Sequence, residues 1–229
     1  GSGSSGFHYL LLDDSLSMTD RWAEPNGETT SFMVAVEETK KIARKLSQAN
    51  GVQQMRIVLL SDPASVVFEG SINEQAIEEL SLKLDALKPG FLHRDALKGM
   101  ETAGEYFNGI QVGTKTLHLA GDFREVDWSV GPDKEKLRQG VDRLLEAGVN
   151  LSLVDVAHPY RGENRQLTIH HDNLSVVDFR AESRLAAEGV AVEFSVGIQN
   201  FGAADKKTFL HVKIDGQEDF GASQPVDSL

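Results

Sequence analysis

The amino-acid sequence predicts an α/β fold with a doubly wound, mostly parallel sheet, followed by a carboxy-terminal antiparallel β-segment. In the first two thirds of the chain, short apolar runs alternate with segments whose apolar residues have helical spacing. Strands separated by helices in this way form parallel βαβ crossovers. From residue 173 onward the helical period disappears, and apolar and polar residues alternate one by one, which is typical of half-buried antiparallel strands. We therefore expect two domains, at residues 7–158 and 173–229.

The strands expected in the first domain are short apolar runs between turn residues. The first, Phe7–Leu12, is almost wholly apolar, as in a strand buried on both faces. The run at 65–70 lies between turn residues and suits an edge strand. The remaining strands are expected at 55–60, 116–120 and 149–156, and helices at 35–46, 76–87, 96–107 and 137–144. A polar loop is expected between the first strand and the first helix.

The carboxy-terminal segment alternates apolar and polar residues over Val192–Ile198 and Leu210–Ile214, with turn residues at 200–202 and 215–216. About three strands fit here, whereas a complete β-sandwich needs about seven. No strand is expected after Gly221. We interpret the segment as truncated, with free strand edges and an apolar face that needs a cover. A second copy would supply it, giving a homodimer through the β-segments.

Composition excludes several classes of function. The chain has 229 residues and a formal net charge of −12, which repels phosphate backbones, so nucleic acid is not an expected partner. Without cysteine, disulfides and thiolate metal sites are absent. No apolar run approaches the ~20 residues that span a bilayer, so any membrane attachment would come from segments outside this sequence. The Gly/Ser-only stretch at 1–6 is set aside as a cloning scar.

The strongest chemical signal follows the first strand directly. Asp13, Ser15 and Ser17 form an Asp-x-Ser-x-Ser pattern, and alternate positions of a turning loop can converge. One carboxylate and two hydroxyls are the oxygen ligands that a hard divalent cation such as Mg²⁺ or Mn²⁺ accepts. The alternative is a turn or helix-capping cluster, because Asp and Ser favour both.

This pattern at the end of a buried strand resembles the metal-ion-dependent adhesion site of von Willebrand factor A domains, which have a Rossmann-like α/β fold. The resemblance implies an adhesion or assembly module. It also implies a second aspartate after the fourth buried strand, where Asp122 stands. The expected metal ligands are therefore Asp13, Ser15, Ser17 and Asp122. Strand-end placement predicts that all four meet at the carboxyl edge of the sheet.

The sequence also departs from this family. The threonine expected about five residues before an Ala-Leu pair is missing, and Phe91 stands about where it should be. Arg94 or His93 could neutralise the carboxylates in place of a metal. Asp122 is followed by Phe123, where a glycine is common. We therefore interpret the site as degenerate, with weak divalent binding at most. His170 and His171 are a weaker metal candidate, because they also suit a solvated linker.

A closer resemblance covers the segments 10–18, 122–128 and 154–156, and the step to 173–176. The residues of these segments are similar to those of the membrane-anchored bacterial Bat-type (aerotolerance-regulator) proteins. The segments at 200–202 and 212–216 are similar to bacterial cell-adhesion-related (CARDB-like), Ig-like domains. The resemblance implies a membrane-anchored bacterial protein at the extracytoplasmic face of the membrane.

These observations predict a non-catalytic protein-binding or assembly module whose partner could be captured through an acidic side chain. We expect no catalytic and no cofactor-binding residues, because the glycine-rich nucleotide and phosphate loops and the Gly-x-Ser-x-Gly elbow are all missing. The alternative is a metal-assisted hydrolase that uses Asp13 and Asp122.

Overall fold

The computed structural model describes residues 4–25, 27–90, 94–124, 128, 133–157, 174–182, 192–200 and 205–227. The chain divides into two compact units, Gly1–Arg165 and Gln166–Leu229. The predicted domain bounds, 7–158 and 173–229, stay a proposal, because residues 158–173 lie outside the described part of the chain.

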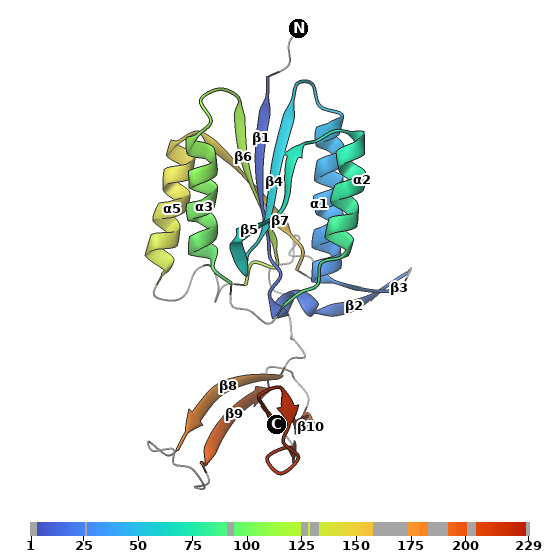
Figure 1. Cartoon of the computed structure of the whole chain (residues 1–229), viewed down its shortest axis with the longest axis vertical. Coiled ribbons are helices and arrows are strands. Elements are labelled where there is room, and N and C mark those ends of the chain that lie inside the picture. The colour runs from blue at the N-terminus through green and yellow to red at the C-terminus, as the bar shows by residue number, and fades with distance from the viewer. Residues whose placement is uncertain are drawn as a thin grey trace. The chain divides into compact units, whose positions relative to one another are not determined.

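The first unit is built on a five-stranded sheet with the order β5-β4-β1-β6-β7 (Figure 1). Four strands are parallel, and β5 pairs antiparallel with β4 at one edge. The strands are β1 (Gly6–Leu12), β4 (Gln53–Leu59), β5 (Asp62–Ser71), β6 (Thr114–Gly121) and β7 (Val149–Asp155). The predicted mostly parallel sheet, with the run at 65–70 at its edge, is confirmed.

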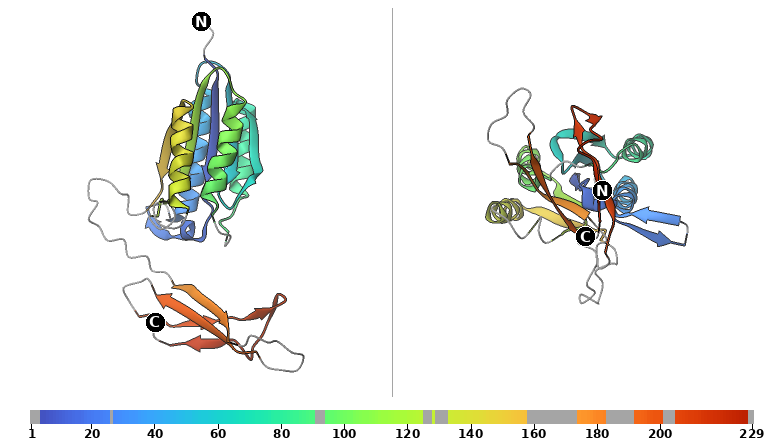
Figure 2. Two further views of the ribbon diagram at one scale, coloured as in Figure 1. Left: turned by 90° about the vertical axis from the view of Figure 1, so that its left-hand side faces the viewer. Right: turned by 90° about the horizontal axis from the view of Figure 1, so that it is seen from below.

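Helices cover both faces of this sheet (Figures 1 and 2). One face carries α1 (Ser31–Ser47) and α2 (Glu74–Asp85), and the other carries α3 (Ala96–Asn108) and α5 (Lys134–Glu146). Three of these helices begin at a side-chain cap, in which Thr30, Asn73 and Asp95 accept a backbone N–H of the first turn. The doubly wound arrangement predicted from the alternating pattern is confirmed.

The core lies on both sides of β1. Leu10 and Leu12 pack into the cluster under α1 and α2, and Tyr9 and Leu11 into the cluster under α3. All four are at most 1 % exposed, which explains why the strand is an unbroken apolar run. On α3, a Cβ on Gly99 would lie 3.1 Å from a methyl group of Leu11, so the glycine allows the helix to approach the sheet closely.

The expected polar loop between β1 and α1 contains structure. Leu16–Thr19 forms a 3₁₀ turn, and β2 (Arg21–Glu24) pairs antiparallel with β3 (Gly27–Thr30). The loop interpretation was wrong for this hairpin. Its turn signals around Pro25 and Gly27 lie between strands too short to show an alternating pattern.

The second unit consists of small antiparallel sheets. β8 (Leu174–Ala181) pairs with β9 (Phe194–Asn200). Two further pairs join β10 (Thr208–Leu210) to β13 (Gln224–Val226) and β11 (Lys213–Ile214) to β12 (Gln217–Glu218). The antiparallel prediction is confirmed, but the estimate of about three strands was too low. The expected strand at 210–214 is split in two, and a strand does follow Gly221. Strands of two or three residues are too short to carry a period.

The described residues of this second unit include no buried side chain. Its largest apolar groups are exposed instead: Phe179 is 66 % exposed and Phe194 is 56 % exposed, and their rings stack with centroids 5.4 Å apart. Among the residues that the structure describes, no helix combines the length and apolar character needed to cross a bilayer.

Candidate functional site

The two candidate carboxylates lie side by side because they follow neighbouring parallel strands. β1 ends at Leu12 opposite Ala120 of β6, so Asp13 and Asp122 leave the sheet at the same edge. The Asp13 N–H donates to the Ala120 carbonyl oxygen at 2.8 Å, which fixes the first turn out of the strand. Asp13 is 1 % exposed and Asp122 is 4 % exposed. Both carboxylates are therefore buried and need hydrogen-bonding partners.

Gly121 makes this close approach possible. A Cβ at position 121 would lie 2.9 Å from the Asp13 Cβ and 3.1 Å from its Oδ2. Any other residue would have to push the aspartate away.

The two serines turn back toward Asp13. The Ser15 N–H donates to Asp13 Oδ1 at 2.9 Å, and the Ser15 and Ser17 hydroxyl oxygens are 3.1 Å apart. The structure thus brings Asp13, Ser15 and Ser17 together at the start of the 3₁₀ turn, as the alternate spacing predicts. The bond from Ser15 N–H to Asp13 is also the local turn that an aspartate favours, so the turn interpretation describes part of the same cluster.

Arg94 bridges the two aspartates. Its Nη1 lies 2.6 Å from Asp13 Oδ2 and 3.4 Å from Asp122 Oδ1, and its side chain is 9 % exposed. Burial raises the pKa of the Asp13 carboxyl above its ordinary value, whereas Arg94 and the bonds from Ser15 act to lower that pKa. The sequence-based alternative in which Arg94 neutralises the carboxylates is therefore the arrangement that the structure contains.

A second arginine extends the cluster. The Arg124 Nε donates to Asp122 Oδ2 at 2.8 Å, and its Nη2 lies 2.7 Å from Asp20 Oδ2. Charges of opposite sign therefore alternate along the edge in the order Asp13, Arg94, Asp122, Arg124, Asp20; this row of side chains is called the ion-pair chain below. The sequence analysis missed Arg124 and Asp20, because no local pattern links residues 104 positions apart.

The four predicted metal ligands do not fit a divalent cation as they are arranged here. Each carboxylate oxygen of Asp13 and Asp122 already accepts from a neighbouring N–H group of Ser15, Arg94 or Arg124. A cation placed between the aspartates would also meet two guanidinium charges. Among the described residues, no group of three or more His, Cys, Asp or Glu side chains is placed to hold a metal. His170, His171, His93 and Phe91 lie outside the described residues.

Asp14 holds the surrounding loops rather than joining the site. Its Oδ1 accepts the Ser61 N–H at 3.0 Å, and its Oδ2 accepts the Ser61 hydroxyl at 2.5 Å. Its carbonyl oxygen accepts the Gly90 N–H at 2.7 Å. The two adjacent aspartates therefore have different roles. Asp13 belongs to the ion-pair chain, and Asp14 connects the end of β1 to the end of β4 through Ser61.

Phe123 adopts the left-handed backbone region, with φ of 43°. This conformation is costly for a bulky residue and free for glycine, which is the residue that the family resemblance favours here. The ring packs against Trp128, with centroids 5.6 Å apart. The strained position follows Asp122 directly, so it helps to set the direction in which the chain leaves the site.

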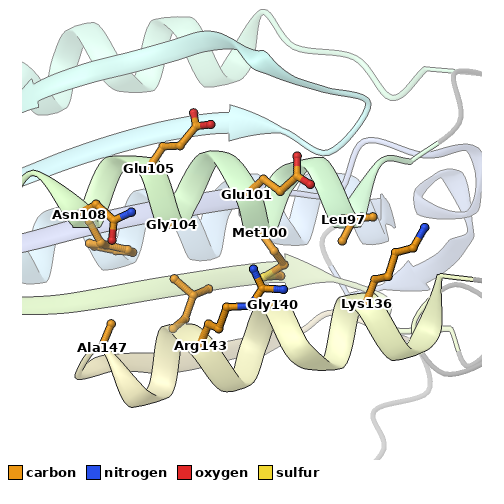
Figure 3. A pocket seen from close by; sticks show the side chains of 12 residues that line it. Leu97, Met100, Glu101, Gly104, Glu105, Asn108, Lys136, Gly140, Arg143 and Ala147 are labelled. Atoms are coloured by element: carbon orange, nitrogen blue, oxygen red, sulfur yellow. The ribbon is translucent and has the colours of Figure 1, made fainter.

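Two hollows lie away from this edge cluster and share no residue with it. A groove of about 410 Å³ runs between α3 and α5, with Glu101 and Glu105 on one wall and Lys136 and Arg143 on the other (Figure 3). A second hollow of about 570 Å³ lies between α3 and the β4–β5 edge.

No family model and no curated protein matches the chain. Similar solved structures include proximal thread matrix protein 1 (PTMP1) from the mussel byssus, at 18% identity and a TM-score of 0.47, covering 66% of this chain and 35% of that one. This chain therefore spans about a third of PTMP1. A PTMP1 structure with a zinc-occupied MIDAS motif is also similar, at 16% identity and a TM-score of 0.43, with the same coverage.

Two bacterial proteins are similar as well. An uncharacterized membrane spanning protein from Vibrio fischeri has 15% identity and a TM-score of 0.38, covering 66% of this chain and 70% of that one. The conserved hypothetical protein BatB from Bacteroides thetaiotaomicron has 11% identity and a TM-score of 0.41, covering 87% and 82%. A Bat-type protein is thus among the solved structures that are similar to this chain.

Proposed function

We propose that the first unit is a non-catalytic protein-binding or assembly module, and that it binds through the carboxyl edge of its sheet around Asp13, Ser15, Ser17 and Asp122. The ion-pair chain at this edge carries the proposal. Burying several charges adds little net stability compared with apolar packing. It does fix the directions of the loops that leave β1 and β6, and an ordered set of loops at a sheet edge is what a binding surface needs.

The same contacts disfavour the metal-assisted hydrolase. General acid–base work needs a carboxyl group that can reach a substrate or an activated water. Asp13 and Asp122 are nearly inaccessible, and both of their carboxylates are held by arginines.

Among the described residues around the ion-pair chain, the 3₁₀ turn offers an exposed apolar side chain. Leu16 lies between the two serines and is 44 % exposed. An apolar side chain among hydroxyl groups suits the centre of a small protein contact with a polar rim. Capture of an acidic side chain, expected from the resemblance, needs a positive charge that is not yet neutralised, and Arg94 and Arg124 each already hold two aspartates. We therefore assign the contact to Leu16 and Ser17.

Binding to a membrane extract of the source organism tests this assignment. We expect Leu16→Asp to lose the proteins that the unaltered chain retains, because it places a charge at the centre of the contact. Leu82→Asp is the matched control, since Leu82 is 74 % exposed on α2. If Leu16→Asp retained the same proteins, the binding surface would not include Leu16.

We further propose, from the Bat-type resemblance, that the module belongs to a membrane-anchored bacterial protein and faces the extracytoplasmic side. A fusion of the full natural protein to alkaline phosphatase, which is active only outside the cytoplasm, tests this. An inactive but stable fusion would contradict it.

For the second unit, interpreted as Ig-like, we propose that a second copy covers its exposed aromatic face. Isolated two-stranded sheets are marginal in water, and a two-fold axis could place two Phe179–Phe194 stacks against each other. Sedimentation at ~100 μM, which populates a dimer whose dissociation constant is about micromolar, should show a dimer. Phe194→Ser should yield a monomer, while Val112→Ser, which alters an 83 % exposed residue of the first unit, should not. A monomeric unaltered chain would refute the dimer.

A further inference from the structure

We infer that Arg94 is a built-in cation: its guanidinium group occupies the place between Asp13 and Asp122 where a divalent metal would be held, so this edge of the domain is ordered without metal. The inference concerns the chemistry of the site alone. It stands whether or not the edge binds a protein partner.

The contacts place the positive charge of Arg94 between the two carboxylates. Nη1 is 2.6 Å from Asp13 Oδ2 and 3.4 Å from Asp122 Oδ1. The side chains of Asp13, Asp122 and Arg94 are 1 %, 5 % and 9 % exposed, so water cannot screen these charges effectively. A shared donor at these distances does for the two aspartates what a bridging cation would do.

The local charge is close to balanced without a metal. Three carboxylates, of Asp13, Asp122 and Asp20, face the two guanidinium groups of the ion-pair chain. A divalent cation would give this buried cluster a net positive charge. Such a charge is unfavourable where water is excluded.

The serine hydroxyl groups are also arranged as in a site without a metal. A metal would take the Ser15 and Ser17 oxygens as ligands, but these oxygens lie 3.1 Å apart and bond each other. The second oxygen of Asp13 accepts from the Ser15 N–H. These oxygens therefore already have hydrogen-bond partners within the cluster.

The backbone fixes where Arg94 stands. The next residue, Asp95, donates its N–H to the Leu60 carbonyl oxygen at 2.9 Å, at the end of β4. The Asp95 side chain also accepts the Lys98 N–H at 2.8 Å and so caps α3. Arg94 therefore precedes a helix start that is tied to the sheet edge, which orders its side chain toward the aspartates.

Removal of the guanidinium group tests this inference by a gain of metal binding. Arg94→Ser frees Asp13 Oδ2 and Asp122 Oδ1 and adds a hydroxyl group. Titration of the full chain with Mn²⁺, followed by calorimetry, should show no binding up to ~10 mM for the unaltered chain and binding at least about tenfold tighter for Arg94→Ser. Asp13→Ala combined with Arg94→Ser should lose the gain, and Arg138→Ser, which removes an exposed arginine of α5, should not produce it.

Two outcomes would overturn the inference. One is micromolar Mn²⁺ binding by the unaltered chain that Asp13→Ala abolishes, which needs no Arg94 variant to fold. The other is a folded Arg94→Ser protein, with an unchanged circular dichroism spectrum, that gains no binding. Arg94→Lys keeps a positive charge at the site and is expected to bind no Mn²⁺.

Discussion

The two units of this chain differ in how much of their strands they bury. In the first unit, a sheet covered by helices on both faces buries β1 so fully that Leu10, Leu11 and Leu12 are each 0 % exposed. In the second unit, sheets of only two strands leave every described side chain at least partly exposed. The difference shows that strand pairing alone does not create a core. A layer that covers the sheet does.

The largest expected effect is on the first unit. Leu10→Ala should lower its free energy of unfolding by about 3 to 5 kcal/mol, because Leu10 is fully enclosed and the cavity cannot collapse easily. Both tryptophans, Trp22 and Trp128, belong to this unit, so tryptophan fluorescence in a urea titration reports its unfolding selectively. A loss below about 1 kcal/mol would mean that the site repacks and that the core is less rigid than its burial implies.

The second prediction uses a buried histidine pair in the same unit. His8 Nδ1 and His118 Nε2 are 3.0 Å apart, and burial, with a smaller contribution from His8, lowers the pKa of His118 to about 4. The unfolded chain, in which the pKa of a histidine is near 6.5, takes up the proton first as pH falls. Stability should therefore decrease between pH 6.5 and pH 4 by about 2 to 3 kcal/mol from this residue.

His118→Gln should flatten that part of the stability profile relative to the unaltered chain, measured by tryptophan fluorescence at a series of pH values. His211→Gln is the matched control, because His211 lies in the second unit. If the stability of His118→Gln and of the unaltered chain changed with pH at the same slope, the histidine pair would not be the cause of the pH dependence.

A third, smaller effect concerns the sheet edge. Gly121→Ala should destabilise the first unit by about 1 to 3 kcal/mol, because its Cβ would collide with Asp13 and loosen the pair with Arg94. Gly70→Ala on β5 is the control, since its Cβ would make only an ordinary contact, 3.7 Å from Phe68. If the thermal melts of the two variants coincided, the sheet edge would accommodate the Cβ at position 121 without a loss of stability.

The smallest effect is expected in the second unit. Val196 on β9 is only partly buried, so Val196→Ala should cost less than about 1 kcal/mol and leave the tryptophan transition unchanged. Amide hydrogen exchange of β8 and β9 measures the change directly. A cost comparable to that of Leu10→Ala would show that Val196 is enclosed as fully as Leu10.

The sequence predicts those parts of the fold whose burial is periodic. The unbroken apolar run of β1 and the helical spacing of α1 and α3 reflect burial on two faces or on one stripe, so both were predicted correctly. The hairpin β2–β3 and the short strands β10 to β13 bury too few side chains to produce a regular alternation of apolar and polar residues in the sequence. Their pairing depends on contacts made after the chain has folded.

The site was predictable to the extent that strand ends determine it. Asp13 and Asp122 meet because β1 and β6 are neighbours. Strand-end placement predicted only their shared edge, and Asp122 was named through the family resemblance. The Arg94 bridge was one of two alternatives in the sequence, because nothing local distinguishes a side chain that points to an aspartate from one that points to solvent. Asp14, Asp20 and Arg124 were missed for the same reason.

The parallel arrangement of β1, β6 and β7 also determines how the first unit bears mechanical load. The chain enters β1 at the amino ends of the parallel strands and leaves β7 at their carboxyl ends (Figure 1). Tension applied through residues 6 and 155 pulls these strands along their own axes in opposite directions. All the ladder bonds that β6 makes with both strands are then loaded at once in shear, whereas a hairpin pulled from its open end separates one bond at a time. The rate of forced unfolding depends on the height of that barrier. A pull along the strands should therefore meet more resistance than one that opens a hairpin from its end.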